Sequence, residues 1–167
     1  MTPADRLARR AAHPPYRAAA VLGVLVLFGY LLSLAPSVTF WDAGEFVSAM
    51  KVGGIPHPPG TPLFVMMGQV WGKLFPFGEF AFRTNLLSAL FSAAGAGCWF
   101  LVLHEAATAT LAEADEANRS GLATAAAAAG ALIAAFGFTN WLNSNETEVY
   151  AVATFTIPAD LPADERR

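Results

Sequence analysis

Charged residues are scarce in this chain. Asp, Glu, Lys and Arg together make up 14% of its 167 residues, whereas a soluble domain carries about 25%. They are missing altogether from three long windows, 18–41, 84–103 and 120–145. The mean hydropathy is +0.45. So little charge excludes an ordinary soluble domain, whose surface must be wetted on all sides, and indicates an integral membrane protein.

Cysteine pairs and basic stripes are also missing. Cys98 is the one cysteine of the sequence and lies inside an apolar window. This excludes a disulfide framework and a metal site built on paired cysteines. Lys and Arg form no stripe, and the formal net charge is -3, so the composition gives no indication of a nucleic-acid partner.

Each uncharged window reaches the roughly 20 residues that a helix needs to cross about 30 Å of hydrocarbon. We therefore predict an all-α integral membrane fold with about three transmembrane helices and a short juxtamembrane helical outer segment. The predicted segments are a cytoplasmic basic tail at 1–17, a first span at 18–37, an outer loop with short helices at 38–82, a second span at 83–103, a cytoplasmic loop at 104–120, a third span at 121–139, an outer loop at 140–150, and a truncated fourth span with a divergent tail at 151–167.

The distribution of arginine predicts the orientation. Four arginines lie in the first 17 residues, and no Lys or Arg follows the first span until Lys51. The positive-inside rule then places the N-terminus in the cytoplasm and 38–82 on the outer face. A cleaved signal peptide is the alternative, but its apolar core would be only about 7–15 residues long. A membrane anchor is therefore favoured.

The outer segment is predicted to be ordered. Residues 42–50 have the pattern of a short helix, with Asp42 near the N-terminus, where the helix dipole favours an anion. Residues 53–62 contain four prolines, which forbid a continuous helix. Residues 63–75 are apolar but too short to span a bilayer, so we expect a helix lying in the membrane interface.

This topology brings several polar residues to the outer face. They are Asp42, Glu45, His57, Arg83, Glu146 and Glu148. A charge within hydrocarbon costs roughly 2.5–3.5 kcal/mol on insertion scales, so acids at the membrane boundary are expected to face water, a partner or a ligand. Carboxylates beside an arginine and a histidine are suited to acid–base or transferase chemistry.

Spacing alone leaves simpler interpretations open. An acid pair at a helix start also serves as a cap and a solvated charge, and a histidine among prolines is commonly a turn residue. An arginine at the end of a span often anchors it in the headgroups. Acids in a polar loop are ordinarily solvated, so these residue types do not by themselves establish a site.

The order of four motifs is more specific. WDAGEF is followed by GIPHPPGTPLF, then FRTNLLSALFSA, then NETEVYAVATF. This order resembles the start of the GT-C superfamily of membrane glycosyltransferases, which use lipid-linked sugars. The nearest branch contains uncharacterised bacterial proteins related to the eukaryotic O-mannosyltransferase that modifies plexin-type receptors. The resemblance covers about 18–156 and implies a partial GT-C bundle.

The resemblance implies roles for individual residues. Asp42 occupies the position of the general base for the acceptor hydroxyl, with Glu45 as its partner or as the alternative base. The donor would be a polyprenyl-phosphate sugar, expected to be mannose, and the acceptor a protein or glycan. Arg83 is the first candidate for contact with the donor phosphate and His57 the second, while Glu148 would line the same cavity.

No cofactor is predicted. Asp42, Glu45 and His57 carry oxygen and nitrogen ligands suited to a divalent metal ion, as in some members of the wider superfamily, but the O-mannosyl branch does not favour one. The composition, rich in Ala and Arg, suggests a bacterial multi-pass protein of the inner membrane with its active side toward the periplasm. Membrane lipid and the remaining transmembrane helices of a longer parent protein are the other expected partners.

The chain also departs from the family pattern. It has about three spans where family members have many more, and its composition changes abruptly after about Thr156. We expect a truncated or frameshifted product, inactive alone, that forms the N-terminal part of such a transferase. The alternatives are a non-catalytic membrane scaffold or subunit, an inactive remnant, and a small carrier. A carrier is disfavoured because no ionisable group lies in mid-span.

Overall fold

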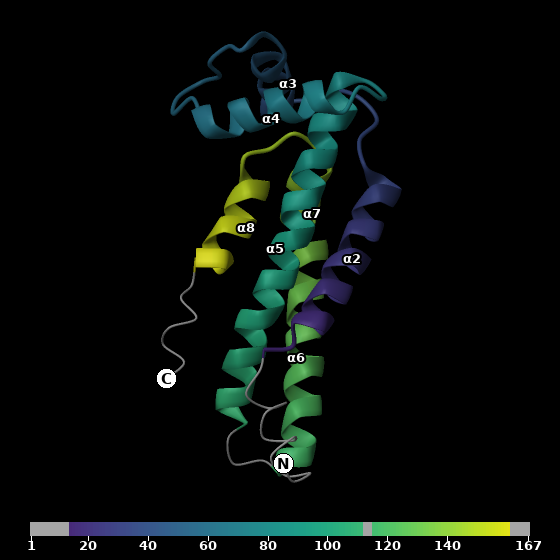
Figure 1. Cartoon of the computed structure of the whole chain (residues 1–167), viewed down its shortest axis with the longest axis vertical. Coiled ribbons are helices and arrows are strands. Elements are labelled where there is room, and N and C mark those ends of the chain that lie inside the picture. The colour runs from purple at the N-terminus through teal and green to yellow at the C-terminus, as the bar shows by residue number, and fades with distance from the viewer. Residues whose placement is uncertain (1–13, 112–114, 161–167) are drawn as a thin grey trace.

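A computed structural model describes residues 14–111 and 115–160, and every regular element in these ranges is an α-helix (Figure 1). The helices are α2 (Tyr16–Ser33), α3 (Asp42–Val52), α4 (Pro62–Leu74), α5 (Phe80–Thr110), α6 (Glu116–Phe136), α7 (Phe138–Asn145) and α8 (Tyr150–Asp160). Most of the predicted basic tail, part of the predicted inner loop and most of the divergent tail lie outside the described residues.

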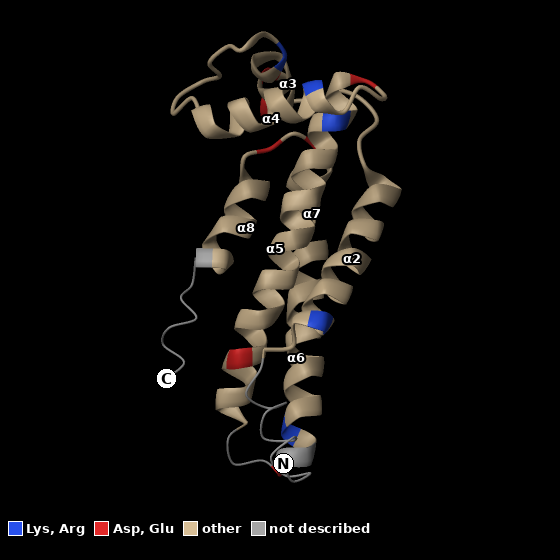
Figure 2. Cartoon of the chain, in the orientation of Figure 1, with Lys and Arg blue, Asp and Glu red and all other residues tan. Residues whose placement is uncertain are grey.

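Within the described residues, three helices are long and apolar enough to cross a membrane, Tyr16–Ser33, Phe80–Thr110 and Asn118–Phe136. This confirms the predicted all-α membrane fold. Charged side chains lie toward the two ends of the bundle and in the layer that caps it, while the shaft between them is almost free of charge (Figure 2). That distribution is what a hydrocarbon slab requires of the helices that cross it.

The helix ends differ from the predicted boundaries. α2 ends at Ser33, four residues before the end of the predicted span, ahead of the proline at position 36. α5 extends beyond 83–103 at both ends, because the alanine-rich stretch after Leu103 continues the helix as far as Thr110. The predicted outer loop 140–150 contains most of α7, which Gly137 separates from α6 with a non-helical ψ of 138°.

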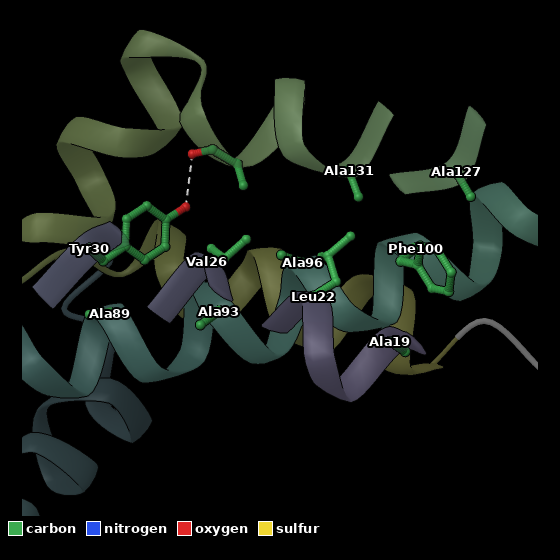
Figure 3. Packing of buried hydrophobic residues seen from close by; sticks show 11 residues of the cluster. Ala19, Leu22, Val26, Tyr30, Ala89, Ala93, Ala96, Phe100, Ala127 and Ala131 are labelled. Atoms are coloured by element: carbon green, nitrogen blue, oxygen red, sulfur yellow. Dashed lines mark hydrogen bonds between the residues drawn. The ribbon is translucent and has the colours of Figure 1, made fainter. Parts of the chain in front are cut away.

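The bundle is organised around α5, against which α2, α6 and α8 pack (Figure 1). The core between these helices combines small residues of α5 and α6 with larger ones of α2 (Figure 3). On α6 the buried alanines recur at every fourth position, Ala123, Ala127, Ala131 and Ala135, so they form one face toward the core. Small residues let helix backbones approach closely, which drives packing where lipid removes the hydrophobic advantage.

One polar bond closes one end of this core. Tyr30 is fully buried, and its hydroxyl donates a hydrogen bond of 2.8 Å to the carbonyl oxygen of Ala135 (Figure 3). The Ala135 carbonyl lies in the last turn of α6, where helix carbonyls lack a partner within the helix. The bond therefore joins α2 to the end of α6 without leaving a buried polar group unpaired.

α3 and α4 form a layer across one end of the bundle (Figure 1). A second core joins them, built from Phe46, Ala49, Met50, Phe64 and Val65, and Val149 before α8 and Val152 in its first turn pack against it. The opposite face of α4 is apolar and exposed, at positions 63, 66, 70 and 74. The prediction that this helix lies in the membrane interface agrees with that face and remains a prediction.

We predict that Gly95→Ala destabilises the bundle. A Cβ at Gly95 would lie 2.8 Å from the backbone carbonyl oxygen of Thr154 in α8, and since backbone cannot rotate aside, α5 and α8 must separate at a cost of about 1–3 kcal/mol. Gly121→Ala is the matched control, because nothing lies within 4 Å of its Cβ. Thermal unfolding in detergent should show a lower midpoint for Gly95→Ala alone, and equal midpoints would contradict this account of the packing.

Candidate functional site

The first turn of α3 carries both acids of the WDAGEF motif. Asp42 is the first residue of the helix and Glu45 ends its first turn, so both carboxylates lie where the helix dipole is positive. The residue before them, Trp41, has φ 64°, although it is not glycine, and its side chain is 93% exposed. Backbone conformations of this kind are costly and concentrate at functional sites, which directs attention to this turn.

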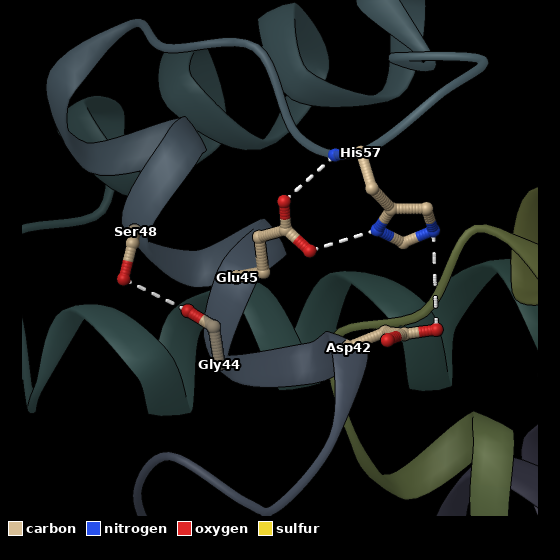
Figure 4. Close-up of polar contacts among 5 residues, drawn as sticks. All are labelled: Asp42, Gly44, Glu45, Ser48 and His57. Atoms are coloured by element: carbon tan, nitrogen blue, oxygen red, sulfur yellow. Dashed lines mark hydrogen bonds and ion pairs between the residues drawn. The ribbon is translucent and has the colours of Figure 1, made fainter.

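The proline loop returns His57 to the same turn. Its backbone N–H donates a 2.7 Å hydrogen bond to Glu45 Oε1, and its Nδ1 lies 2.8 Å from Glu45 Oε2 (Figure 4). A turn fixes the histidine backbone from the other side, because the N–H of Gly60, at φ 79°, donates to the His57 carbonyl. Glu45 thus accepts hydrogen bonds from His57 on both carboxylate oxygens, and these two bonds fix the orientation of the imidazole.

The far side of the imidazole ring faces the second acid. His57 Nε2 lies 4.0 Å from Asp42 Oδ2 (Figure 4). The side chains of Asp42, Glu45 and His57 are 59%, 44% and 44% exposed, so all three are open to water. Asp42 is the least committed of them, because its carboxylate makes no contact with the imidazole shorter than this one.

Mutual hydrogen bonding shifts the protonation of the Glu45–His57 pair. The hydrogen bonds from His57 lower the pKa of Glu45 below its ordinary value. The hydrogen bond to Glu45 raises the pKa of His57, with smaller contributions from the charges of Glu45, Asp42 and Glu148. The arrangement therefore favours an imidazolium with a carboxylate on each side.

Glu148 is a third acid near this cluster, and it is buried. It lies between α7 and α8 and is 6% exposed. Its pKa is raised to about 7, first by burial and then by the charges of Glu146 and Asp42, while a backbone hydrogen bond and His57 act in the opposite direction. A buried carboxyl group whose pKa is raised to near neutrality is typical of a functional site.

The hydrogen bonds that the Arg83 guanidinium donates go to the backbone, and the group also lies 5.5 Å from the ring centre of Phe80. Its Nη1 donates to the carbonyl oxygens of Gly72 and Phe75, and its Nε donates to that of Glu79. These bonds satisfy carbonyls at the end of α4 and leave the second terminal nitrogen for any other partner. Contact between Arg83 and a phosphate stays a prediction, and it would depend on that nitrogen.

Asp42, Glu45 and His57 also form the set best placed to hold a metal ion among the described residues. Ligand atoms of Asp42, Glu45 and His57 all lie within 4.8 Å of one another, and carboxylate oxygens with an imidazole nitrogen suit several divalent ions. Both oxygens of Glu45 are already engaged with His57, so an ion would have to compete with that pair. The imidazolium supplies the positive charge that two neighbouring carboxylates require, and the residues fit without a metal.

Sequence reasoning missed a set of buried polar residues beside the site. Thr84, Asn85 and Ser88 of α5 and Thr147 beside Glu148 are each at most 1% exposed. Their signal in the sequence is a line of polar positions 84, 88 and 92, which recur every four residues and so share one face of an otherwise apolar span. In a membrane helix, polar residues on one face indicate contact with another polar segment.

Comparison with known proteins supports the relationship to an O-mannosyltransferase that the order of the motifs suggests. The family model described as the protein O-mannosyl-transferase TMEM260 N-terminal domain matches residues 42–159, a range that includes every predicted site residue. "Protein O-mannosyl-transferase TMEM260" of Mus musculus is 38% identical over 91 residues, which cover 52% of this chain and 13% of the mouse protein. "Protein O-mannosyl-transferase tmem260" of Dictyostelium discoideum is 32% identical over 63 residues, 36% of this chain and 8% of that protein. The match thus spans a small part of each relative. No solved structure matches the chain.

We predict that Glu45→Gln lowers the pKa of His57 toward its ordinary value, because the hydrogen bond that the imidazole donates to the Glu45 carboxylate is the largest cause of the increase. Asp42→Asn removes an equal charge that lies 4.0 Å from the ring, and the shift should be smaller. Imidazole chemical shifts followed by NMR against pH in detergent measure both. A larger shift for Asp42→Asn than for Glu45→Gln would show that Asp42, not Glu45, holds the imidazole.

We also predict that stability falls as the pH rises through neutrality. The pKa of Glu148 is about 7 in the fold and 4.5 for the free side chain, so between these values the folded state binds more protons than the unfolded state. Its contribution is complete below pH 4.5 and is lost as the pH rises through 7, by about 3 kcal/mol at most. Glu148→Gln should flatten the dependence of the unfolding midpoint on pH, while Glu146→Gln should keep most of it. An unchanged slope in Glu148→Gln would contradict the assignment.

Proposed function

The chain belongs to the family of the protein O-mannosyl-transferase TMEM260 N-terminal domain. From that premise we propose that it forms the N-terminal, catalytic part of a membrane mannosyltransferase. The proposed donor is mannose linked to a polyprenyl phosphate, and the proposed acceptor is a protein hydroxyl group on the outer face of the membrane. The observation that carries the proposal is the Asp42–His57–Glu45 arrangement at the end of the apolar bundle.

Asp42 is the proposed general base. Its carboxylate is more than half exposed and touches His57 only at 4.0 Å, so an acceptor hydroxyl can approach it. Glu45 is less suited to this role, because both of its oxygens hold His57 and its lowered pKa makes it a weaker base than an ordinary glutamate. Of the two acids that the motif offers, we therefore assign the proton transfer to Asp42 and the positioning of the imidazole to Glu45.

The proposed step balances without a cofactor. Asp42 takes the proton of the acceptor hydroxyl while the oxygen of that hydroxyl forms a bond to C1 of the mannose. The bond between C1 and the phosphate oxygen breaks, and polyprenyl phosphate leaves with the electron pair. A cation is needed where negative charge develops on the leaving group. His57, protonated beside two carboxylates and 44% exposed, is the proposed group, with the free terminal nitrogen of Arg83 as the alternative.

The apolar bundle supports a membrane-delivered donor. The long apolar helices α2 and α5 each have one end on the side of the layer formed by α3 and α4 (Figure 1), so a lipid tail in the bilayer and its sugar head at the boundary would reach the site from one side. The acceptor would arrive from the aqueous side, toward which the three side chains are exposed.

We predict that Asp42→Asn abolishes transfer. Removing a general base typically costs about 10²- to 10⁴-fold in rate, and the amide keeps the size of the side chain. Glu45→Gln should reduce the rate less, by lowering the protonation of His57. Membranes that contain the complete gene product are assayed for transfer of radiolabelled mannose from polyprenyl-phosphate mannose to a peptide rich in Ser and Thr.

The control is Glu105→Gln, an acid-to-amide change in the last third of α5, toward the end opposite the site. It should retain the wild-type rate. A wild-type rate of mannose transfer in both Asp42→Asn and Glu45→Gln would contradict the catalytic assignment. It would favour a membrane scaffold whose outer acids bind a partner.

A further inference from the structure

A cluster of buried polar side chains lies at the outer end of α5, outside the site just described. We call Thr84, Asn85, Ser88 and Thr147 the Asn85 hub. Each of them is at most 1% exposed, and polar groups buried in this way cost free energy unless they are hydrogen-bonded. The hub is therefore held in place by its bonds, and these bonds show what it connects.

Both the nitrogen and the oxygen of the Asn85 carboxamide are hydrogen-bonded. Its Nδ2 donates to the carbonyl oxygen of Ala35 at 3.0 Å and to that of Ser37 at 3.1 Å. Because carbonyl oxygens accept only, these two bonds fix which end of the amide is nitrogen. The other end, Oδ1, accepts a 2.6 Å bond from the hydroxyl of Thr147. One side chain thus joins the segment between α2 and α3 to the segment between α7 and α8.

The remaining members complete the network. The Thr147 hydroxyl, which donates to Asn85 Oδ1, also lies 2.8 Å from the Thr84 hydroxyl, and Thr84 in turn donates to the carbonyl oxygen of Ala81 at 3.0 Å. The Ser88 hydroxyl accepts the backbone N–H of Glu148 at 3.2 Å. A direct bond of 3.1 Å from the N–H of Ala35 to the carbonyl of Asn145 runs between the same two segments.

Both segments lead into the site. The one that Asn85 holds at Ala35 and Ser37 ends at Asp42, the first residue of α3. The one held at Thr147 continues directly to Glu148. Asp42 and Glu148 are close enough for the charge of the first to raise the pKa of the second, together with Glu146 and against His57. The geometry of the hub therefore sets the spacing between the proposed base and the buried acid.

We propose that Asn85 is a positioning residue of the site, which holds Glu148 beside Asp42 and His57 by binding both segments at once. The role in transfer rests on the proposed function. While Glu148 is neutral, Asp42 is spared a like charge and the donor phosphate meets a less negative surface. When Glu148 ionises, both advantages are lost, so transfer should decline as the pH rises above neutrality.

The test follows the carboxyl group of Glu148 directly. The full chain in lipid nanodiscs is titrated with acid and base while the infrared carbonyl band of protonated carboxyl groups is recorded. The band that Glu148→Gln removes is the band of Glu148. In the wild type the band should disappear near pH 7. Thr147→Val keeps the side-chain shape but removes the hydroxyl, so the loop loosens and water reaches Glu148. Its proton affinity should then fall at least about tenfold, the effect of one lost hydrogen bond.

Two matched variants separate positioning from packing. Thr147→Ser keeps the hydroxyl and should titrate as the wild type. Ser92→Ala removes a hydroxyl that is 1% exposed in the same helix, one turn beyond Ser88, and that has no hydrogen-bond partner among the described residues. It should also titrate as the wild type. Asn85→Ala removes the whole bridge and should give the largest fall.

The result that overturns the proposal is a wild-type titration of Glu148 in both Thr147→Val and Asn85→Ala, with helical content by circular dichroism unchanged. If Asn85→Ala does not fold, the near-isosteric Thr147→Val decides the question. The readout needs no transfer assay. A hub that fails this test is thus distinguishable from a failed catalytic assignment, which depends on Asp42→Asn.

Discussion

The packing of all the other elements against α5 is the constraint on which this structure depends. α2, α6 and α8 reach its shaft through glycines and alanines, and α3 and α4 cover its outer end. Close approach leaves little tolerance, because a Cβ at Gly97 would lie 3.0 Å from the carbonyl oxygen of Ala19. The segments that carry the site share the second core, and Arg83 and Asn85 bind them to the first turns of α5, so α5 determines where they lie.

The site resolves a problem of charge repulsion. Neighbouring carboxylates need compensation, since like charges repel. Asp42 and Glu45 obtain it from the imidazole between them and from the positive end of α3. Glu148, which is buried, obtains it from a proton. The pKa of Glu45 is thus lowered and that of nearby Glu148 is raised, a combination that suits proton transfer better than a group of identical carboxylates.

Much of the fold was predictable from the sequence, because hydrocarbon excludes charge and the uncharged windows reveal the spans. The helix that begins at Asp42 was predictable as well, since local signals determine it. The meeting of His57 with Glu45 was not, because it depends on the path of the loop through Gly53 and Gly60.

The burial of Glu148 was also beyond the sequence. A glutamate in a polar loop is ordinarily solvated, and only the bonds of Thr147 and Ser88 with their neighbours remove it from water. The length of α5 was underestimated for a different reason: its last turns are too polar for a membrane window but are rich in alanine, which favours helix.

That length has a consequence for how the protein sits in bilayers of different thickness. A helix of 31 residues measures about 46 Å at about 1.5 Å per residue, against about 30 Å of hydrocarbon. The excess is taken up by tilt or by protrusion at the ends. Arg83 and Asn85, in the first two turns of α5, bind the end of α4 and the segment before α3, so the layer formed by α3 and α4 is attached to one end of this long helix. We therefore expect a thicker or thinner membrane to change the tilt of α5 and to move the layer with it.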